Sequence, residues 1–155
     1  MSTGLQDLTK QSPVVIERCE AADFQGVFGL LRQLWPGKEL ERDTLRQIFE
    51  QAVRARSRVL LQATAEGEVV GFGSMTLKMH LWHGGLIAWI DELVVNERHR
   101  GLGVGKLLLE YLVELARERG CRAVELDSAF HRLGAHAFYE EMGFEKRAYL
   151  FCKRF

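Results

Sequence analysis

The sequence predicts a mixed α/β domain in which helices cover both faces of one central sheet. Some segments have apolar residues at helical spacing, and others are β-branched or alternate between apolar and polar residues. Together they predict the order β-α-α-β-β-β-α-β-α-β. Turns at 66–67 and 84–85 join successive strands as hairpins, so most of the sheet is expected to be antiparallel. The strand at 86–95 is apolar on both faces, which places it at the centre of the sheet.

Local patterns place each element in the first half of the chain. The β-branched run 14–16 predicts the first strand, and apolar spacing after the N-cap residue Asp23 predicts a helix that ends at 35–37. The strand at 59–65 pairs with the alternating run from Glu68. A second helix is expected at 43–55, where the inward positions are Leu45, Ile48, Phe49 and Val53.

The second half of the chain continues this alternation. Gly120 ends the strongest predicted helix, which covers 103–119. A short strand at 123–126, a helix at 135–142 and one or two closing strands at 144–155 complete the expected fold. The inner face of the helix at 103–119 is made by Leu107, Leu108, Tyr111, Leu112 and Leu115.

Composition excludes several classes of protein. The 155 residues are 47% hydrophobic, with equal numbers of basic and acidic side chains. They therefore predict one globular domain (1–155), not a disordered chain, a general nucleic-acid binder or a polybasic membrane-surface protein. There is no run of 18 apolar residues and no signal-peptide core, and residues 1–12 are expected to be a loosely ordered tail. Three cysteines without a C-x-x-C pair favour a reducing compartment, the cytoplasm.

A glycine-rich turn between the central strand and the strongest helix is the most informative segment. Gly101, Gly103 and Gly105 let the backbone approach a ligand and turn successive N–H groups toward one point. The helix that follows adds its unpaired N–H groups and the positive end of its dipole. Arg100 and Lys106 add positive charge. The segment therefore predicts a site for a phosphate or pyrophosphate group.

Two common phosphate-binding motifs do not fit this turn. A P-loop requires a glycine where Arg100 stands and a hydroxyl group where Leu107 stands. A Rossmann turn requires a third glycine at Lys106 and a position after the first strand of a βαβ unit. The pattern that remains is Arg100-x-x-Gly103-x-Gly105.

This pattern resembles the R/Q-x-x-G-x-G/A motif of the GCN5-related N-acetyltransferases (GNAT). A second segment, Ala135-His136-Ala137-Phe138-Tyr139 followed by Gly143-Phe144, is similar to the A-x-x-F-Y-x-x-x-G-F helix of that family. The two motifs have the expected order and separation, and the resemblance covers residues 86–145. It implies a GNAT-like fold, acetyl-CoA as cosubstrate and transfer of an acetyl group to an amine.

The resemblance also implies which residues bind the cofactor. The pyrophosphate would lie on the turn, and the pantetheine arm would lie on backbone groups of a strand that separates from its neighbour. The chain departs from many members at Ala129, where they carry an asparagine that contacts the cofactor. The expected contacts are Leu93, Val94, Val95, Arg100, Gly101, Leu102, Gly103, Val104, Gly105, Lys106, Ala135 and Phe138.

Acetyl transfer to an amine also requires proton transfers. Tyr139 is the candidate acid for the departing thiolate, and its alternative roles are thioester positioning and packing. Asp91 and Glu92 interrupt the apolar central strand, and either carboxylate can remove the amine proton. Adjacent strand residues face opposite sides, so only one should point into the site unless a bulge intervenes. We favour Glu92 slightly and retain Asp91; a salt bridge or a strand-end cap is the alternative for each.

Two histidines beside the turn at 84–85 are secondary candidates. With the neighbouring motifs, His80 and His83 resemble aminoalkylphosphonate N-acetyltransferases, whose activity is associated with a divalent metal. A divalent metal is therefore possible, but an H-x-x-H pair has no obvious third ligand, so no metal site is predicted. The alternative is a pair of solvated turn residues.

The leading functional hypothesis is an enzyme that moves acetyl from acetyl-CoA to a primary amine of a small molecule. Protein or peptide N-acetylation and a non-catalytic CoA-binding sensor of the same fold are the alternatives. No nucleic-acid or membrane partner is expected, and the resemblance makes a homodimer possible. The sequence does not identify the acceptor amine.

Overall fold

The computed structural model describes residues 13–155, so the tail expected at 1–12 lies outside the described residues. One five-stranded sheet has the spatial order β1-β2-β3-β4-β5. Neighbouring strands are antiparallel except β4 and β5, which are parallel, so the predicted mostly antiparallel α/β sheet is confirmed. The strands are β1 (Val15–Arg18), β2 (Arg58–Ala65), β3 (Glu68–His80), β4 (Gly85–Val95) and β5 (Val124–Glu125).

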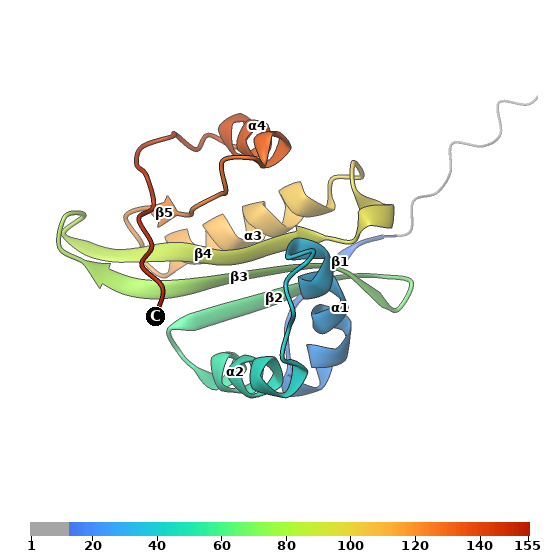
Figure 1. Ribbon diagram of the computed structural model, residues 1–155. Helices are drawn as coiled ribbons and strands as arrows, with labels where there is room; N and C mark the ends of the chain where they lie inside the picture. The colour runs from blue at the N-terminus through green and yellow to red at the C-terminus, as the bar shows by residue number, and fades with distance from the viewer. Residues whose placement is uncertain (1–12) are drawn as a thin grey trace, which may run out of the picture.

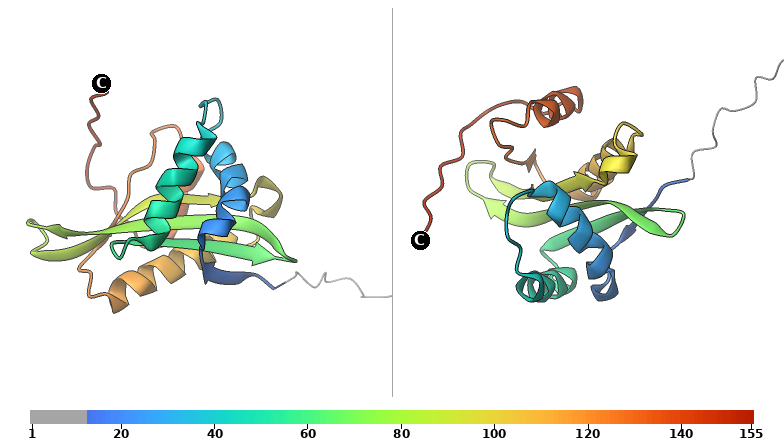
Figure 2. Two further views of the ribbon diagram at one scale, coloured as in Figure 1. Left: turned by 90° about the horizontal axis from the view of Figure 1, so that it is seen from below. Right: turned by 45° about the vertical axis from the view of Figure 1, so that its right-hand side comes forward.

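Helices lie on both faces of this sheet (Figure 1, Figure 2). One face carries α1 (Phe24–Leu34) and α2 (Arg42–Arg54), and the other carries α3 (Val104–Glu118) and α4 (Leu133–Glu141). Each face has its own apolar core, and β4 contributes Val94 to one and Ile90 to the other. The central position predicted for this strand is therefore confirmed. No helix within residues 13–155 is long and apolar enough to cross a bilayer.

Three details of the helices differ from the predictions. Asp23 ends the short 3-10 helix η1 (Ala21–Asp23), and its carboxylate accepts a hydrogen bond from the Glu20 N–H at 2.6 Å instead of capping α1. Ile48 and Tyr111 are 51% and 47% exposed, although the apolar spacing predicts that both face inward. The buried stripe of a helix is set by where it meets the sheet, so α2 and α3 bury Ala52 and Leu109 instead.

The closing strands expected at 144–155 are not formed. No helix or strand follows α4, and the last backbone hydrogen bond there runs from the Phe144 N–H to the Tyr139 carbonyl at 2.9 Å. Within the described residues, β5 is therefore an edge strand. The aromatic and aliphatic composition of 144–155 favours a strand locally, but a strand also needs a partner with which to form hydrogen bonds.

Candidate active site

A β-bulge in β4 brings the two candidate carboxylates to one face of the sheet. The register between β3 and β4 shifts just after the pair Ser74–Glu92, so Asp91 is an additional residue in β4. Glu92 accepts a hydrogen bond from the Ser74 hydroxyl, and Asp91 accepts one from the Thr76 hydroxyl at 2.6 Å. Because Ser74 and Thr76 are two residues apart in one strand, they point to the same side, and so do both acids.

The two carboxylates have different electrostatic environments. Asp91 forms an ion pair with Arg58 of β2, with 3.5 Å between Oδ2 and Nη2. Burial raises the pKa of Glu92; the Ser74 hydrogen bond opposes this increase, the charge of Asp91 adds to it, and Arg58 opposes it. Asp91 is therefore a paired, charged group, whereas Glu92 is a carboxylate with an increased affinity for a proton.

Beyond the bulge, β4 has an open edge. It pairs with β5 only at Ala88 and Trp89 but continues to Val95. Leu93, Val94 and Val95 pair with β3 on one side and have no neighbouring strand on the other among the described residues. Backbone groups that point to this open side can bind an extended ligand. The strand separation that the sequence resemblance implies is therefore present in β4.

The glycine-rich turn lies at the end of the same open edge. It follows the short 3-10 helix η2 (Glu97–His99). Gly101 and Gly103 have positive φ angles of 76° and 83°, and Gly103 directly precedes α3. The first N–H groups of α3 have no partner within the helix, so the turn and the helix end have the donors that an anion site requires. Arg100 Nε donates a hydrogen bond to the Val95 carbonyl at 3.3 Å, which links the turn to β4.

The other predicted cofactor contacts take different positions around this turn. Val104 is buried, so its side chain anchors the start of α3, whereas Leu102 is 48% exposed. Lys106 forms an ion pair with Glu110, with 3.9 Å between Nζ and Oε1. At Gly105 the helix passes close to the second motif, because a Cβ there would be 3.4 Å from Val95 and 3.8 Å from Phe138. Ala135 lies in the first turn of α4.

Tyr139 shares a cavity with both acids. This cavity of about 420 Å³ is bounded by the α1–α2 loop, β4, the segment after β5, and α4. The Tyr139 ring packs against Phe138 and Phe144, with centroid distances of 5.3 and 5.8 Å. Burial raises the pKa of Tyr139; Arg132 opposes the increase and Asp127 adds to it. The phenol is therefore protonated at neutral pH and able to donate a proton.

The lining of the cavity and the contacts of its acids include residues that sequence reasoning did not select. Ser74 is fully buried, and its place in an alternating strand gave no sign of its contact with Glu92. Ser128 lines the cavity beside Ala129, and its buried hydroxyl has no hydrogen-bond partner among residues 13–155. Trp35 and Lys38 come from the loop after α1, which carries no recognisable motif.

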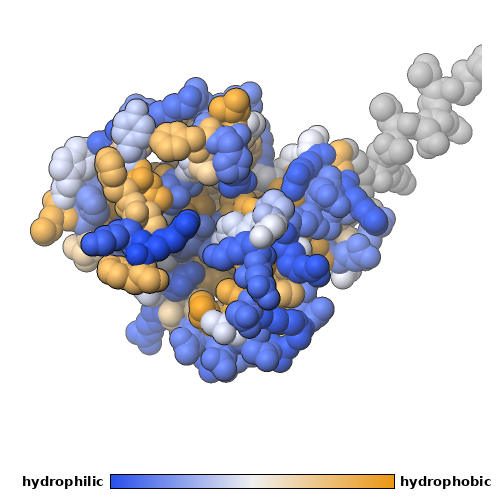
Figure 3. Space-filling model, viewed as in Figure 1, coloured by the Kyte–Doolittle hydropathy of each residue, from blue (hydrophilic) through white to orange (hydrophobic). Residues whose placement is uncertain are grey.

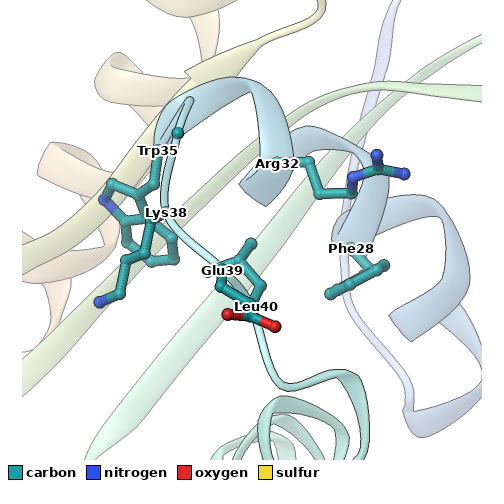
Figure 4. Close-up of a pocket in the computed structure, with 7 residues that line it drawn as sticks. Phe28, Arg32, Trp35, Lys38, Glu39 and Leu40 are labelled. Carbon is teal, nitrogen blue, oxygen red and sulfur yellow. The ribbon is translucent and has the colours of Figure 1, made fainter.

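A second cavity of about 440 Å³ adjoins the first, because Trp35 and Lys38 line both. Figure 4 shows these two side chains on one side, Arg32 and Phe28 on the other, and Glu39 and Leu40 between them. Lys38 Nζ lies 5.6 Å from the centre of the Trp35 ring. The space beside the acids therefore continues into an aromatic and charged groove.

The two hairpin histidines do not line either cavity. His83 Nε2 lies 2.8 Å from Glu125 Oε1, and the rings of His80 and His83 are 5.1 Å apart. In the part of the chain that the structure describes, no three His, Cys, Asp or Glu side chains are grouped to hold a metal ion. His83 thus connects the β3–β4 hairpin to β5.

Comparisons with known proteins agree with this geometry. The acetyltransferase (GNAT) family matches residues 24–144. An aminoalkylphosphonate N-acetyltransferase from Salmonella typhimurium is 33% identical over 131 residues, which are 84% of each chain. An aminoglycoside N(6')-acetyltransferase type 1 from Stenotrophomonas maltophilia is 29% identical over 138 residues, covering 87% of this chain and 88% of that one.

A solved aminoglycoside N-acetyltransferase in complex with CoA has the same fold. It superimposes with a TM-score of 0.83 at 21% identity, over 95% of this chain and 97% of that chain. The family match, the open edge of β4 and the glycine turn point to one conclusion. This chain belongs to the GNAT family of acetyltransferases, with acetyl-CoA as its cosubstrate.

Proposed function

We propose that the protein transfers the acetyl group of acetyl-CoA to a primary amine of a small molecule by direct attack. Glu92 accepts the proton of the bound ammonium group, and the amine nitrogen then attacks the thioester carbonyl carbon. The N–C bond forms and the C–S bond breaks, while the thiolate receives the proton of the Tyr139 hydroxyl. The nitrogen loses its second proton as it becomes an amide, this proton restores the Tyr139 phenol, and the proton held by Glu92 passes to solvent. The observation that supports this most is the single cavity that contains both acids and this phenol.

The base has a defined task. A primary amine with a pKa near 10 is about 99.9% protonated at pH 7. Removing its proton at that pH costs about 4 kcal/mol. The raised pKa of Glu92 brings its proton affinity closer to that of the amine. Asp91 cannot take this role as easily, because it is already bound to Arg58 and Thr76. We therefore assign Asp91 to electrostatic attraction of the ammonium group and Glu92 to proton removal.

The cofactor is assigned to the open edge of β4. Its diphosphate would lie on the turn 100–106, and its pantetheine arm would extend along 93–95 toward Tyr139. Backbone N–H groups on that edge would polarise the thioester carbonyl as charge develops on its oxygen. Phe138 and Ala135 would contact the arm from α4.

The two adjoining cavities favour a small acceptor with an anionic group. Lys38 and Arg132 line the first cavity, and neither has a carboxylate in ion-pair contact among the described residues. Arg32 adds a third such cation in the second cavity. An amine bound near Glu92 could therefore place a phosphonate, phosphate or carboxylate beside these side chains.

The compartment follows from the cysteines. Cys19, Cys121 and Cys152 are free, and burial raises the pKa of Cys19 to about 12, so its thiol is unreactive. Free thiols fit a reducing compartment, and we propose the cytoplasm.

A thiol-release assay with acetyl-CoA tests the function. The acceptors are an aminoalkylphosphonate, an amino alcohol of the same length, an aminoglycoside and a peptide with a free N-terminus. We expect release with small amines and the highest kcat/KM with the phosphonate. If CoA binds and no amine accelerates release, the protein is a CoA sensor. Release with the peptide alone would instead identify a peptide acetyltransferase.

A further inference from the structure

Arg58 reaches across the sheet to the bulge that carries the two acids. It is the first residue of β2 and lies opposite Thr76 of β3, while Asp91 is the additional residue of β4. Figure 1 shows these three strands side by side, with β3 in the middle. The Arg58 side chain therefore passes over β3 to bring its Nη2 to 3.5 Å from Asp91 Oδ2.

These contacts hold Asp91 by one of its two carboxylate oxygens. The Thr76 hydroxyl donates a hydrogen bond to Oδ2 at 2.6 Å, and Arg58 Nη2 lies against the same atom. An additional residue in a strand has no residue of its own opposite it, so side-chain contacts decide where it points. Thr76 is a neutral donor, so the positive charge in this arrangement comes from Arg58.

The pair of Arg58 and Asp91 differs from the ion pairs of the surface. Figure 3 shows that hydrophilic side chains cover much of the visible surface over α1 and α2, where water screens their charges. Arg117 and Glu114 form such a surface pair, with side chains that are 69% and 57% exposed. The side chains of Arg58 and Asp91 are only 26% exposed, and Arg58 Nε is buried without a hydrogen-bond partner among residues 13–155. The charge of Arg58 is therefore less screened at the bulge.

Glu92 receives opposite influences from the two members of this pair. Burial raises the pKa of Glu92 most, the charge of Asp91 adds to the increase, and the charge of Arg58 opposes it. Arg58 is the cation that contacts the bulge itself. The other titratable or charged groups around the cavity of Glu92 come from the α1–α2 loop, the segment after β5, and α4: Lys38, Asp127, His131, Arg132 and Tyr139.

We propose that Arg58 is a positioning residue for acetyl transfer: it anchors Asp91 at the bulge and leaves Glu92 as the carboxylate that exchanges a proton with the amine. Without Arg58, two adjacent carboxylates would face one cavity without their balancing charge, and they would share a proton between them. The role in acetyl transfer rests on the proposed function. The anchoring of Asp91 does not.

Carbon-13 NMR titration of the side-chain carboxyl groups measures the ionisation of Glu92 in the absence of any acceptor. The Glu92 signal is the one that is missing from Glu92→Gln. Arg58→Gln should raise the pKa of Glu92 by about 0.5–1 pH unit, because a balancing positive charge is lost. Arg58→Lys keeps the charge and should stay close to the wild type. The matched control is Arg56→Gln, at an exposed arginine of the loop before β2, which should leave the pKa of Glu92 unchanged.

Charge compensation separates positioning from a merely structural role. Asp91→Asn removes a charge that raises the pKa of Glu92, so its combination with Arg58→Gln should return this pKa close to the wild-type value. If Arg58→Gln alone does not fold, the increase from Asp91→Asn to the double variant measures the same effect. The acidic limb of kcat/KM should follow the NMR values in every variant.

Two results would overturn the proposal. An ion pair that only stabilises the sheet would lower the melting temperature of Arg58→Gln and leave the titration of Glu92 unchanged. A limb of kcat/KM that does not follow the NMR values would show that Arg58 does not act on the base. If no amine is acetylated at all, the proposed function fails, and the role of Arg58 in acetyl transfer fails with it. The NMR values then still show whether Arg58 anchors Asp91.

Discussion

α3 and α4 each carry or follow one of the two motifs of the site, but they are held in the fold very differently. α3 buries five residues against the sheet, whereas α4 has no buried residue, and no backbone hydrogen bond between described residues involves 145–155. The proposed anion site before α3 therefore adjoins a helix that is anchored in the core. The position of Tyr139 depends instead on a few ring contacts and on whatever fills the cavity beside it. Cofactor affinity and catalysis should thus respond to different substitutions.

The largest expected effect separates the two helices by function. Tyr139→Phe keeps the ring contacts with Phe138 and Phe144 and removes only the hydroxyl. We expect kcat to fall by about 10²–10⁴-fold because general acid catalysis is lost. The dissociation constant of CoA, measured by calorimetric titration, should not change. Unchanged turnover would contradict the assignment of Tyr139 as the acid.

Substitutions in α3 should lower the free energy of unfolding more than substitutions in α4. Leu112 of α3 is fully buried, so Leu112→Ala should lower the free energy of unfolding by about 2–5 kcal/mol, measured by urea denaturation. The matched control on α4 is Leu133→Ala, at a residue that is 72% exposed. It should change stability by no more than about 0.5 kcal/mol. Similar losses at both positions would show that α4 is packed as firmly as α3.

A smaller effect tests the backbone of the anion site. Gly103 has φ of 83°, so Gly103→Ala should strain the turn by about 1–2 kcal/mol and raise the dissociation constant of CoA by about tenfold. Gly120→Ala is the matched control. Gly120 has φ of 76°, it also has open space around its Cβ position, and it lies at the other end of α3. If both variants bind CoA equally well, the turn is not the diphosphate site.

The smallest effect concerns β4, which lies between the two motifs. If Glu92 is the base, kcat/KM should fall as the pH drops through its raised pKa. Asp91→Asn removes a negative charge that raises this pKa, so the acidic limb should move to lower pH. Ser74→Ala removes a hydrogen bond that favours the carboxylate, so the limb should move to higher pH. Each shift should be below about one pH unit, and shifts of both variants in one direction would argue against Glu92.

The parts of this site that could be predicted are those that depend on patterns among neighbouring residues. Glycine spacing in 101–105 predicts a turn that leads directly into a helix, and the structure has both, with positive φ angles at Gly101 and Gly103. The contact between Ser74 and Glu92 could not be predicted, because it depends on the register between two strands. Trp35 and Lys38 were missed for a similar reason, since only the packing of α1 on the sheet brings their loop to the cavity.

The amino-acid order alone determined the sequence of elements as far as α4, the turn before α3 and the pair of acids in an apolar strand, because spacing and backbone preference act over a few neighbouring residues. Tertiary structure decided that a bulge turns Asp91 and Glu92 to the same side, that β4 and β5 separate after two paired residues, and that 144–155 finds no strand partner among residues 13–155. These outcomes depend on hydrogen bonds between segments that are distant along the chain, and no local pattern specifies them.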